Sequence, residues 1–358
     1  MKLKGIVILL LYVFNVSAQQ KQLDSLFTAN FKNGRFDGSV LITKANQVIF
    51  EKQYGLANRQ FSVPINKETR FSIASITKLY VSVLALKLKE QGKLDFNNTI
   101  DVYVPALLPK YNTKIKVKDL IHHTSGLPNE KIPDYMVKLS PKDFIIKRIK
   151  DTLLFEPGSK YRYNNVNFIL LTAILEQVSG KPWAVLLDEL IVKPLKLKNT
   201  GVTSRDSVIN NLAYGYYNYS FGNEKVKDPL QNNYPLYIEN YAGAGAMFST
   251  PRELLQFSLA LERGQIINTP SLLALYQPLK EIGLVENRDY YVSPGGYVGE
   301  EIIAGKKNVI IERNGNIGGF NHTYLQLPNV QYKVIIFCNT DAGNLKKITN
   351  EVVSIINR

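Results

Sequence analysis

Ser75 and Lys78 form the only Ser-x-x-Lys sequence in the chain, and they stand at the start of the apolar run Ile76–Leu88. A helix that begins near Ser75 places the two side chains one turn apart on the same face. Because the following residues are apolar on nearly all sides, we expect this helix to be buried. Burial disfavours the charged form of a lysine, so its amine can accept a proton from a neighbouring serine. The pair is a candidate nucleophile and base.

The same two residues also have a purely structural interpretation. Ser75 would cap the helix, and Lys78 would extend its amine along the surface into water. Motifs this short recur by chance in a chain of 358 residues, so the motif alone favours the structural interpretation. A catalytic interpretation needs further groups, namely a proton shuttle and an oxyanion site. Unpaired backbone N–H groups at the helix start can serve the second need.

Tyr163 and Asn165 are candidates for the remaining groups. They lie two residues apart, after a Pro-Gly turn and just before the helix-like run 168–175. Residues i and i+2 of an extended segment point the same way, so both side chains can face one cleft. A tyrosine beside a cationic lysine has its phenolate favoured and can act as a general base. The alternative is a surface loop, because the chain has 21 tyrosines and repeats the spacing at Tyr216 and Asn218.

A third segment, Arg313-Asn314-Gly315-Asn316, precedes two further glycines at the end of a strand-like run. Closely spaced glycines let a backbone approach a ligand tightly. Taken alone, the segment is equally compatible with a hairpin turn.

Together the three segments resemble the serine β-lactamase and penicillin-binding-protein superfamily, whose motifs include Ser-x-x-Lys. The likeness is greatest to the branch of class C β-lactamases, D-alanyl-D-alanine carboxypeptidases and esterases. Its other motifs occur in the same order over roughly residues 35 to 340. They are His-Thr-Ser-Gly-Leu-Pro at 123–128, Pro-Gly at 157–158 before Tyr163, and Gly-Ala-Gly followed by Ser-Thr-Pro within 243–251.

The resemblance implies a mechanism through an acyl-enzyme, with no metal and no organic cofactor. It assigns Ser75 as the nucleophile, with Lys78 and Tyr163 as the proton-transfer pair. Asn165 would contact the substrate amide, and the backbone N–H groups of Ser75 and Asn316 would form the oxyanion hole. The expected substrate is a small molecule or peptide that carries a carboxylate and an amide, ester or lactam bond.

The chain departs from the family at Arg313-Asn314-Gly315, where the family has Lys or His, then Thr, Ser or Gly, then Gly. Arg313 keeps a charge that can bind a substrate carboxylate bidentately, but it cannot give up a proton near neutral pH. Asn314 is bulkier than the usual residue and is expected to narrow the cleft. A non-catalytic binding or sensing module that keeps the fold is therefore a second hypothesis, although Ser75, Lys78 and Tyr163 are all retained.

The first eighteen residues are typical of a secretory signal peptide. A basic start, an apolar stretch and the small residues Val16-Ser17-Ala18 predict cleavage after Ala18. The apolar stretch is too short to span a bilayer, so we expect no transmembrane anchor. These features predict export to a periplasm or to the medium.

The composition and charge limit the classes of molecule that the protein is expected to bind. The net charge is +14, but the lysines are scattered, without a basic block interleaved with aromatic residues, which argues against nucleic acid. An exported basic protein can instead meet anionic polymers of the cell envelope.

Cys338 is the only cysteine, so no intramolecular disulfide can form. The three histidines, His122, His123 and His322, lack ligands at metal-binding spacing, and no Gly-x-Ser-x-Gly elbow indicates a Ser-His-Asp hydrolase.

Strand-like patterns lie at both ends of the chain, with helical patterns between about 115 and 275. The alternation at 38–43 and 48–54 predicts a hairpin, and further strands are expected at 308–312, 323–327 and 332–339, before a helix at 344–356. We therefore predict an α/β (α+β) fold of the β-lactamase/transpeptidase type. Residues 19–358 would form one domain, with an antiparallel sheet from about 19–110 and 276–358 and a helical part from about 111–275. The Tyr- and Asn-rich tract 214–241 would be a surface loop or a cleft wall.

Overall fold

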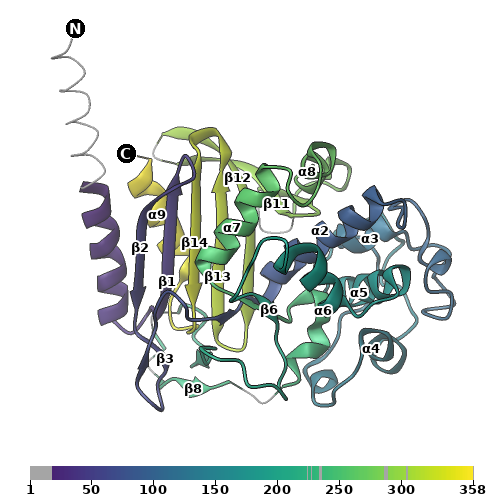
Figure 1. Cartoon of the computed structure of the whole chain (residues 1–358), viewed down its shortest axis with the longest axis horizontal. Coiled ribbons are helices and arrows are strands. Elements are labelled where there is room, and N and C mark those ends of the chain that lie inside the picture. Colours follow the sequence, from purple (N-terminus) through teal and green to yellow (C-terminus); the bar gives the residue numbers. More distant parts are fainter. Residues whose placement is uncertain are drawn as a thin grey trace, which may run out of the picture.

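The computed structural model describes residues 18–223, 225–226, 228–233, 236–285, 289–303 and 305–357. The predicted signal peptide, residues 1–18, lies outside this part of the chain except for Ala18. One large sheet and a helical region lie side by side (Figure 1). In the part of the chain that the structure describes, no helix combines the length and apolarity needed to cross a membrane.

The large sheet has seven antiparallel strands in the order β10-β11-β12-β13-β14-β1-β2. Its strands are β1 (Gly38–Lys44), β2 (Gln47–Tyr54), β10 (Tyr290–Ser293), β11 (Gly296–Ile303), β12 (Lys306–Ile317), β13 (Phe320–Leu327) and β14 (Tyr332–Cys338). The N-terminal hairpin joins the C-terminal strands through β1 and β14, which pair from Gly38 opposite Cys338 to Lys44 opposite Tyr332. The sheet is therefore built from both ends of the chain, as predicted.

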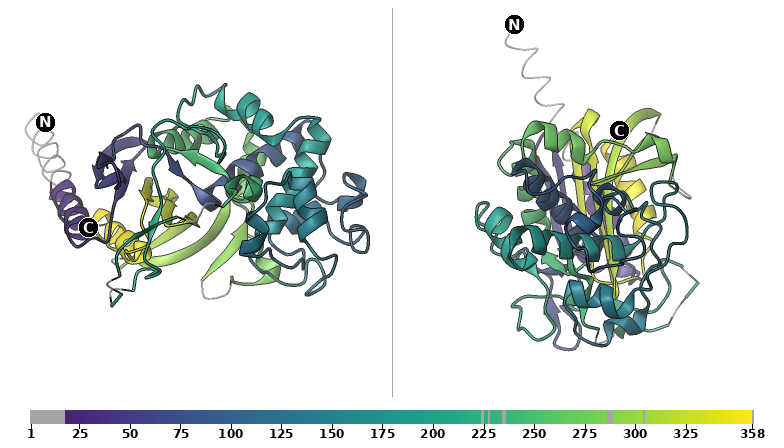
Figure 2. Two further views of the ribbon diagram at one scale, coloured as in Figure 1. Left: turned by 90° about the horizontal axis from the view of Figure 1, so that it is seen from below. Right: turned by 90° about the vertical axis from the view of Figure 1, so that its right-hand side faces the viewer.

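Side chains of the central strands alternate between two cores, because successive residues of a strand face opposite sides. Val40 and Ile42 of β1 belong to one core, with Leu23 and Phe27 of the helix at residues 18–32 and with α9 (Leu345–Ile356). Leu41, between them, belongs to the other core, where α7 (Pro251–Glu262) packs against β1 and β14. Figure 2 shows the helix at 18–32 and α9 side by side on one face of the sheet.

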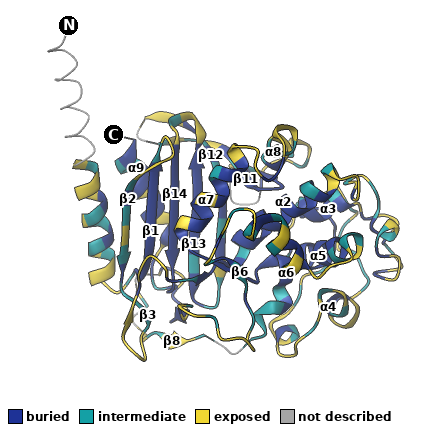
Figure 3. Ribbon diagram, viewed as in Figure 1, coloured by how far each residue is buried: buried dark blue, intermediate teal, exposed yellow. Residues whose placement is uncertain are grey.

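The helical region surrounds α2 (Thr77–Glu90), which packs against α5 (Asn165–Ser179) and which Figure 3 shows as largely buried. All ten residues from 77 to 86 are buried, so the helix lies inside the molecule rather than along its surface. The other helices here are α3 (Val117–Ile121), α4 (Pro141–Arg148), α6 (Trp183–Leu187) and α8 (Thr269–Leu275).

Short strands and turns complete the framework. They are β3 (Leu56–Asn58), β4 (Val63–Pro64), β5 (Phe71–Ser72), β6 (Gly201–Val202), β7 (Tyr216–Tyr217), β8 (Gln231–Asn232) and β9 (Met247–Ser249). A single 3₁₀ turn, η1 (Ala74–Ile76), connects β5 to α2, and a longer one, η5 (Ile238–Ala244), precedes β9. These two turns supply groups of the site described below.

The expected strands and the closing helix are confirmed, with ends that shift by a few residues. The sequence analysis did not predict β10 and β11, because a Pro-Gly-Gly turn interrupts the strand pattern between them. Although α7 falls within the predicted helical part, it packs on the sheet.

Gly315 sets how closely β12 approaches η1. A Cβ atom there would lie 2.4 Å from the carbonyl oxygen of Ile73 and 3.2 Å from Cβ of Ala74. We expect Gly315→Ala to lower the free energy of unfolding by about 2 kcal/mol, because overpacking forces the two backbones apart. Urea denaturation measures this loss.

Gly245→Ala is the matched control for this prediction. Its new Cβ would meet only Tyr241, at 3.4 Å or more, which is ordinary contact distance. Equal stability of the two variants would show that the β12–η1 contact tolerates a methyl group.

Candidate active site

Ser75 lies in η1, directly before α2, and its side chain is partly exposed. The preceding residue, Ala74, has φ +48°, in the left-handed region that costs a non-glycine residue about 1 kcal/mol or more. The chain thus turns sharply from β5 into α2 at this point. Strained backbone of this kind persists where the surrounding structure fixes it, as it often does at functional sites.

Lys78 is completely buried beneath Ser75. Its Nζ atom lies 3.0 Å from Oγ of Ser75, 2.8 Å from Oδ1 of Asn165 and 2.6 Å from the carbonyl oxygen of Ala244. The last two atoms are hydrogen-bond acceptors only. A neutral amine has two N–H groups, which these two acceptors engage, so the nitrogen lone pair is left to face Ser75.

The surroundings favour that neutral form. Burial lowers the pKa of Lys78 well below its ordinary value, and the positive charge of Arg313 lowers it further. Glu130 acts in the opposite direction, as the weakest of the three influences. The lysine is therefore poised as a proton acceptor.

Tyr163 places its hydroxyl oxygen 2.6 Å from Oγ of Ser75. Nζ of Lys78 also lies 5.0 Å from the centroid of the Tyr163 ring. The serine hydroxyl is thus contacted from two sides by groups that can move protons. The structure brings together Ser75, Lys78, Tyr163 and Asn165, the four side chains that the sequence analysis had associated.

The loop at 123–128 holds Tyr163 and the start of α5 in place. Asn164 caps α5 by accepting a hydrogen bond from the backbone of Val166, and its Nδ2 donates to the carbonyl oxygen of Leu127. The buried ring of His123 packs on the ring of Tyr163, with 4.6 Å between centroids. Its Nδ1 lies 3.0 Å from the carbonyl oxygen of Asn164. The His-Thr-Ser-Gly-Leu-Pro loop therefore supports the site from behind.

Asn165 connects Lys78 to a carboxylate. Its Oδ1 accepts from Lys78, and its Nδ2 donates to Oε1 of Glu130 at 2.8 Å. These bonds fix the orientation of the amide, because the acceptor must face the lysine and the donor must face the glutamate.

A cavity of about 290 Å³ opens in front of Ser75. Its described wall consists of Ala74, Ser75, Ile132, Asn165, Tyr217, Tyr219, Phe221, Asn233, Leu236, Tyr241, Ala244, Gly245, Asn316, Ile317, Gly318, Gly319 and Asp341. Both residues of the predicted oxyanion hole, Ser75 and Asn316, lie on this wall. Part of the tract 214–241 belongs to the described wall, which fits the cleft-wall alternative.

Arg313 does not occupy the place that the sequence analysis predicted. Its side chain is 2 % exposed, and its Nε donates to the carbonyl oxygen of Gly295 at 3.2 Å. The guanidinium lies 5.7 Å from the centroid of the Tyr297 ring and is absent from the described cavity wall. Its charge lowers the pKa of Lys78, and one terminal nitrogen of the guanidinium is buried without a hydrogen-bond partner among the described residues.

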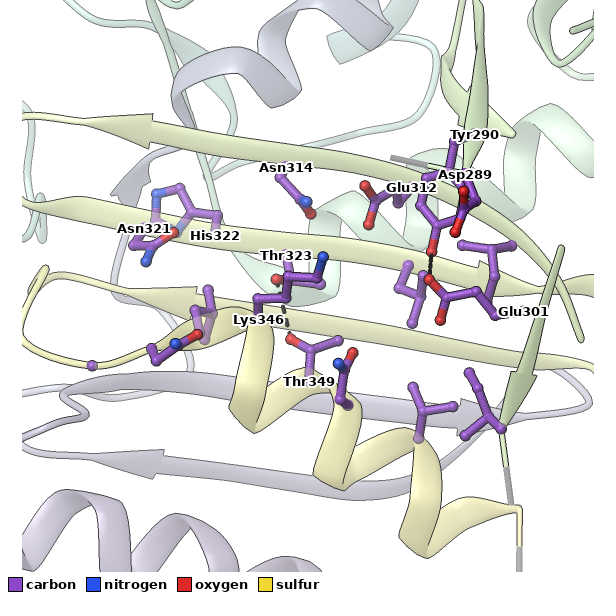
Figure 4. Close-up of a pocket in the computed structure, with 18 of the residues that line it drawn as sticks. Asp289, Tyr290, Glu301, Glu312, Asn314, Asn321, His322, Thr323, Lys346 and Thr349 are labelled. Atoms are coloured by element: carbon purple, nitrogen blue, oxygen red, sulfur yellow. Dashed lines mark hydrogen bonds between the residues drawn. The ribbon is translucent and has the colours of Figure 1, made fainter. Parts of the chain in front are cut away.

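The prediction that Asn314 narrows the cleft is also corrected. On β12, Asn314 points to the opposite face from Arg313 and Gly315, because side chains alternate along a strand. It lines a separate pocket between the sheet and α9, with Glu312, Thr323 and Lys346 (Figure 4). The sequence analysis predicted that Gly315 contacts the substrate. In the structure, Gly315 lies close to η1.

The histidines have structural environments. Burial lowers the pKa of His322 to about 4, and its Nε2 lies 2.7 Å from the carbonyl oxygen of Ser72, which fits a neutral ring that donates there. Burial, Lys78 and Arg313 hold the pKa of His123 well below its usual value. Within the described ranges, no group of three or more His, Cys, Asp or Glu residues is placed to hold a metal ion.

Three groups of the site were missed by the sequence analysis. The carbonyl of Ala244 lies in the Gly-Ala-Gly segment that carried part of the resemblance, so only its contact with Lys78 was new. Glu130 follows the 123–128 loop, and Asp341 follows β14. No local pattern marks either carboxylate, because each reaches the site through the fold.

The chain is similar in sequence to curated proteins. A penicillin-binding protein 4* of Bacillus subtilis (strain 168) is 27% identical over 279 residues, which cover 73% of this chain and 60% of that relative. A teichoic acid D-alanine hydrolase of Staphylococcus aureus (strain MRSA252) is 27% identical over 332 residues, covering 90% of this chain and 76% of that one. The chain thus spans less than two thirds of the first of these relatives.

The fold is also that of solved structures. A penicillin-binding protein from Bacillus halodurans superposes with a TM-score of 0.77 at 23% identity, covering 94% of this chain and 98% of that one. The sequence profile of the Beta-lactamase family matches residues 23–352. That match includes every residue of the site described above, and the chain therefore belongs to the Beta-lactamase family.

Proposed function

We propose that the protein is an exported serine hydrolase that forms an acyl-enzyme on Ser75 and cleaves an ester, amide or lactam bond. The observation that carries the proposal is the position of Nζ of Lys78, 3.0 Å from Oγ of Ser75, with its other contacts made to acceptors. A buried amine so arranged can activate the serine.

In this mechanism Lys78 takes the hydroxyl proton as Oγ of Ser75 attacks the carbonyl carbon. The negative charge on the carbonyl oxygen would be stabilised by the backbone N–H groups of Ser75 and Asn316. The carbon–leaving-group bond then breaks as Tyr163 gives its proton to the leaving group, and Lys78 returns the proton taken from Ser75 to Tyr163. In the second half of the cycle water attacks the acyl-enzyme and loses a proton to the same pair. The bond from the acyl carbon to Oγ then breaks, the pair returns that proton to Oγ of Ser75, and the acid is released.

Export and location are part of the proposal. They are supported by the signal-peptide pattern of residues 1–18 and by the net charge of +14, which suits the anionic polymers of a cell envelope. The name of the teichoic acid D-alanine hydrolase supports removal of a D-alanyl group from such a polymer as one candidate reaction.

The test uses purified protein with p-nitrophenyl acetate, nitrocefin and a D-Ala-D-Ala peptide. We expect turnover of at least one of them and an acyl adduct by intact mass. Trypsin should place the adduct on peptide 71–78, where fragmentation distinguishes Ser75 from Ser72. Silence on all three substrates, with no adduct, would favour the non-catalytic binding module.

A further inference from the structure

A cavity of about 630 Å³ lies along α7, and none of its described lining residues belongs to the Ser75 cavity. One wall is a stripe of residues spaced three or four apart, from Arg252 at the start of α7 to Arg263 just after its end. At a rise of about 1.5 Å per residue, this stripe is about 16 Å long. The segment 194–199 lines the cavity beside the stripe, where Nε2 of Gln256 donates to the carbonyl oxygen of Leu195 at 2.6 Å. The cavity is therefore a groove that follows the length of the helix.

Positive charge dominates the described lining of this groove, which has five basic and two acidic residues. The basic residues are Lys67, Lys196, Lys198, Arg252 and Arg263. Arg252 donates through Nε to Glu51 at 2.6 Å, and Nζ of Lys67 lies 3.9 Å from the same carboxylate. The side chains of Lys196, Lys198 and Arg263 are exposed and form no ion pair or hydrogen bond within the described part of the chain. These three cations can meet an anion without first breaking an internal contact.

The two acidic residues of the groove are engaged by the segment 194–199. Glu253 is buried, and its Oε1 accepts from the backbone N–H groups of Lys198 and Asn199 at 2.7 and 2.9 Å. Glu68 accepts from Nδ2 of Asn199 at 2.6 Å. These contacts also fix the backbone that carries Lys196 and Lys198. The two lysines are thus presented on a held segment, which lowers the conformational cost of binding a ligand.

The distribution of charge and the absence of aromatic rings indicate the kind of ligand. Arg263 stands at one end of the α7 stripe, and Lys67 shares Glu51 with Arg252 at the other. A chain of repeated anions can contact cations along the whole groove, whereas a single small anion cannot. None of the described lining residues is aromatic, although sites for single-stranded nucleic acid combine cations with aromatic rings on which bases stack. A polyanion without bases fits the groove better than nucleic acid does.

We propose that this basic groove is a docking site for a linear polymer with repeated phosphate groups. Lys196, Lys198 and Arg263 make the main contacts, because ammonium and guanidinium groups both bind phosphate. The proposal goes beyond the hydrolase function, since docking needs no turnover. It gives the expected attraction to anionic envelope polymers a place on the molecule. The polymer would be held while the Ser75 cavity stays open, because the two sites have no described lining residue in common.

The first test measures how binding depends on the length of the anion. Inorganic phosphate, tripolyphosphate and long-chain polyphosphate are titrated into the purified protein at equal phosphate concentration. We expect the long chain to bind at least about 100-fold more tightly than inorganic phosphate, with an affinity that falls steeply as salt is added. Equal affinity for the two would overturn the proposal. Tighter binding of oligothymidylate or polyglutamate of equal charge would overturn the assignment to a phosphate polymer.

The second test asks whether the groove is the site of binding. The triple variant Lys196→Gln, Lys198→Gln, Arg263→Gln should bind long-chain polyphosphate at least about ten-fold more weakly, with a shallower dependence on salt. A control variant loses the same charge by change to Gln at three exposed lysines outside the groove, namely Lys142, Lys150 and Lys160. The control should keep most of the affinity. An equal loss in both variants would show that only net charge matters and would overturn the groove.

Two further measurements separate this proposal from the hydrolase proposal. Turnover of p-nitrophenyl acetate should be the same in the triple variant and in the unaltered protein, because every described residue of the Ser75 cavity is kept. Polyphosphate binding is also measured in Ser75→Ala. Binding that depends on the groove supports the proposal even if no substrate is hydrolysed, and its absence contradicts the proposal even if Ser75 is the nucleophile. If the triple variant does not fold, Lys198→Glu compared with Lys142→Glu tests the groove.

Discussion

Ser75→Ala is expected to lower kcat/KM at least about 1000-fold on any substrate that the protein turns over, because Ser75 is the nucleophile of the proposed acyl-enzyme. The variant should also give no adduct with a fluorophosphonate or a labelled penicillin. Steady-state kinetics and intact mass measure the two effects. Full labelling of Ser75→Ala would show that another residue is the nucleophile.

Ser82→Ala is the control for this prediction. Ser82 lies on α2, which follows Ser75 directly; it is buried and donates its hydroxyl to the carbonyl oxygen of Pro294 at 2.7 Å. Its loss removes a buried hydrogen bond worth about 1 kcal/mol but leaves Ser75 in place. Labelling should therefore persist in Ser82→Ala.

Lys78→Met is expected to lower kcat/KM by about 1000-fold while leaving slow labelling of Ser75 detectable. Methionine has a similar length and no proton-accepting amine, and it leaves the acceptors of Asn165 and Ala244 unpaired. Lys87→Met, at a half-buried lysine of the same helix that pairs with Glu90, should keep normal kinetics. If Lys78→Met retained activity, the proton would have to leave Ser75 by another route, and Tyr163 would be the first candidate.

The pH dependence of the unaltered protein follows from the same lysine. The protonated amine has no lone pair, so kcat/KM should fall as the pH drops through the pKa of Lys78. Burial and Arg313 lower that pKa well below the usual value, so the fall should lie far to the acid side of an ordinary lysine titration. An activity that rose only in the alkaline range of a free lysine would contradict the neutral state inferred for Lys78.

The grouping of the candidate catalytic side chains could be predicted from the sequence because local signals mark them. Ser75 and Lys78 share one helical turn, and Tyr163 and Asn165 lie beside a turn and a helix start. The orientation of residues on β12 could not be predicted in the same way. A one-residue change of register reverses which side chains face the cavity, and only the pairing with β11 and β13 fixes it. Asn314 was misplaced for this reason.

Other groups of the site could not be predicted because they reach it through contacts between segments that are distant in the chain. Asp341 lines the same cavity as Ser75 because the segment after β14 pairs with the backbone of Tyr216, next to Tyr217. Ala244 reaches Lys78 because η5 packs on α2. Neither relation has a local pattern, since the residues are far apart in the chain. The general outline of strands at both ends and helices between was accessible because it depends on composition and periodicity alone.

The pairing of β1 with β14 has a consequence for how the molecule forms. β1 emerges early in synthesis, yet its partner on one side is the last strand of the sheet. Until β14 arrives, β1 presents an open edge, and contacts between such distant segments form slowly because a long loop must close first. The sheet cannot be completed on a partial chain.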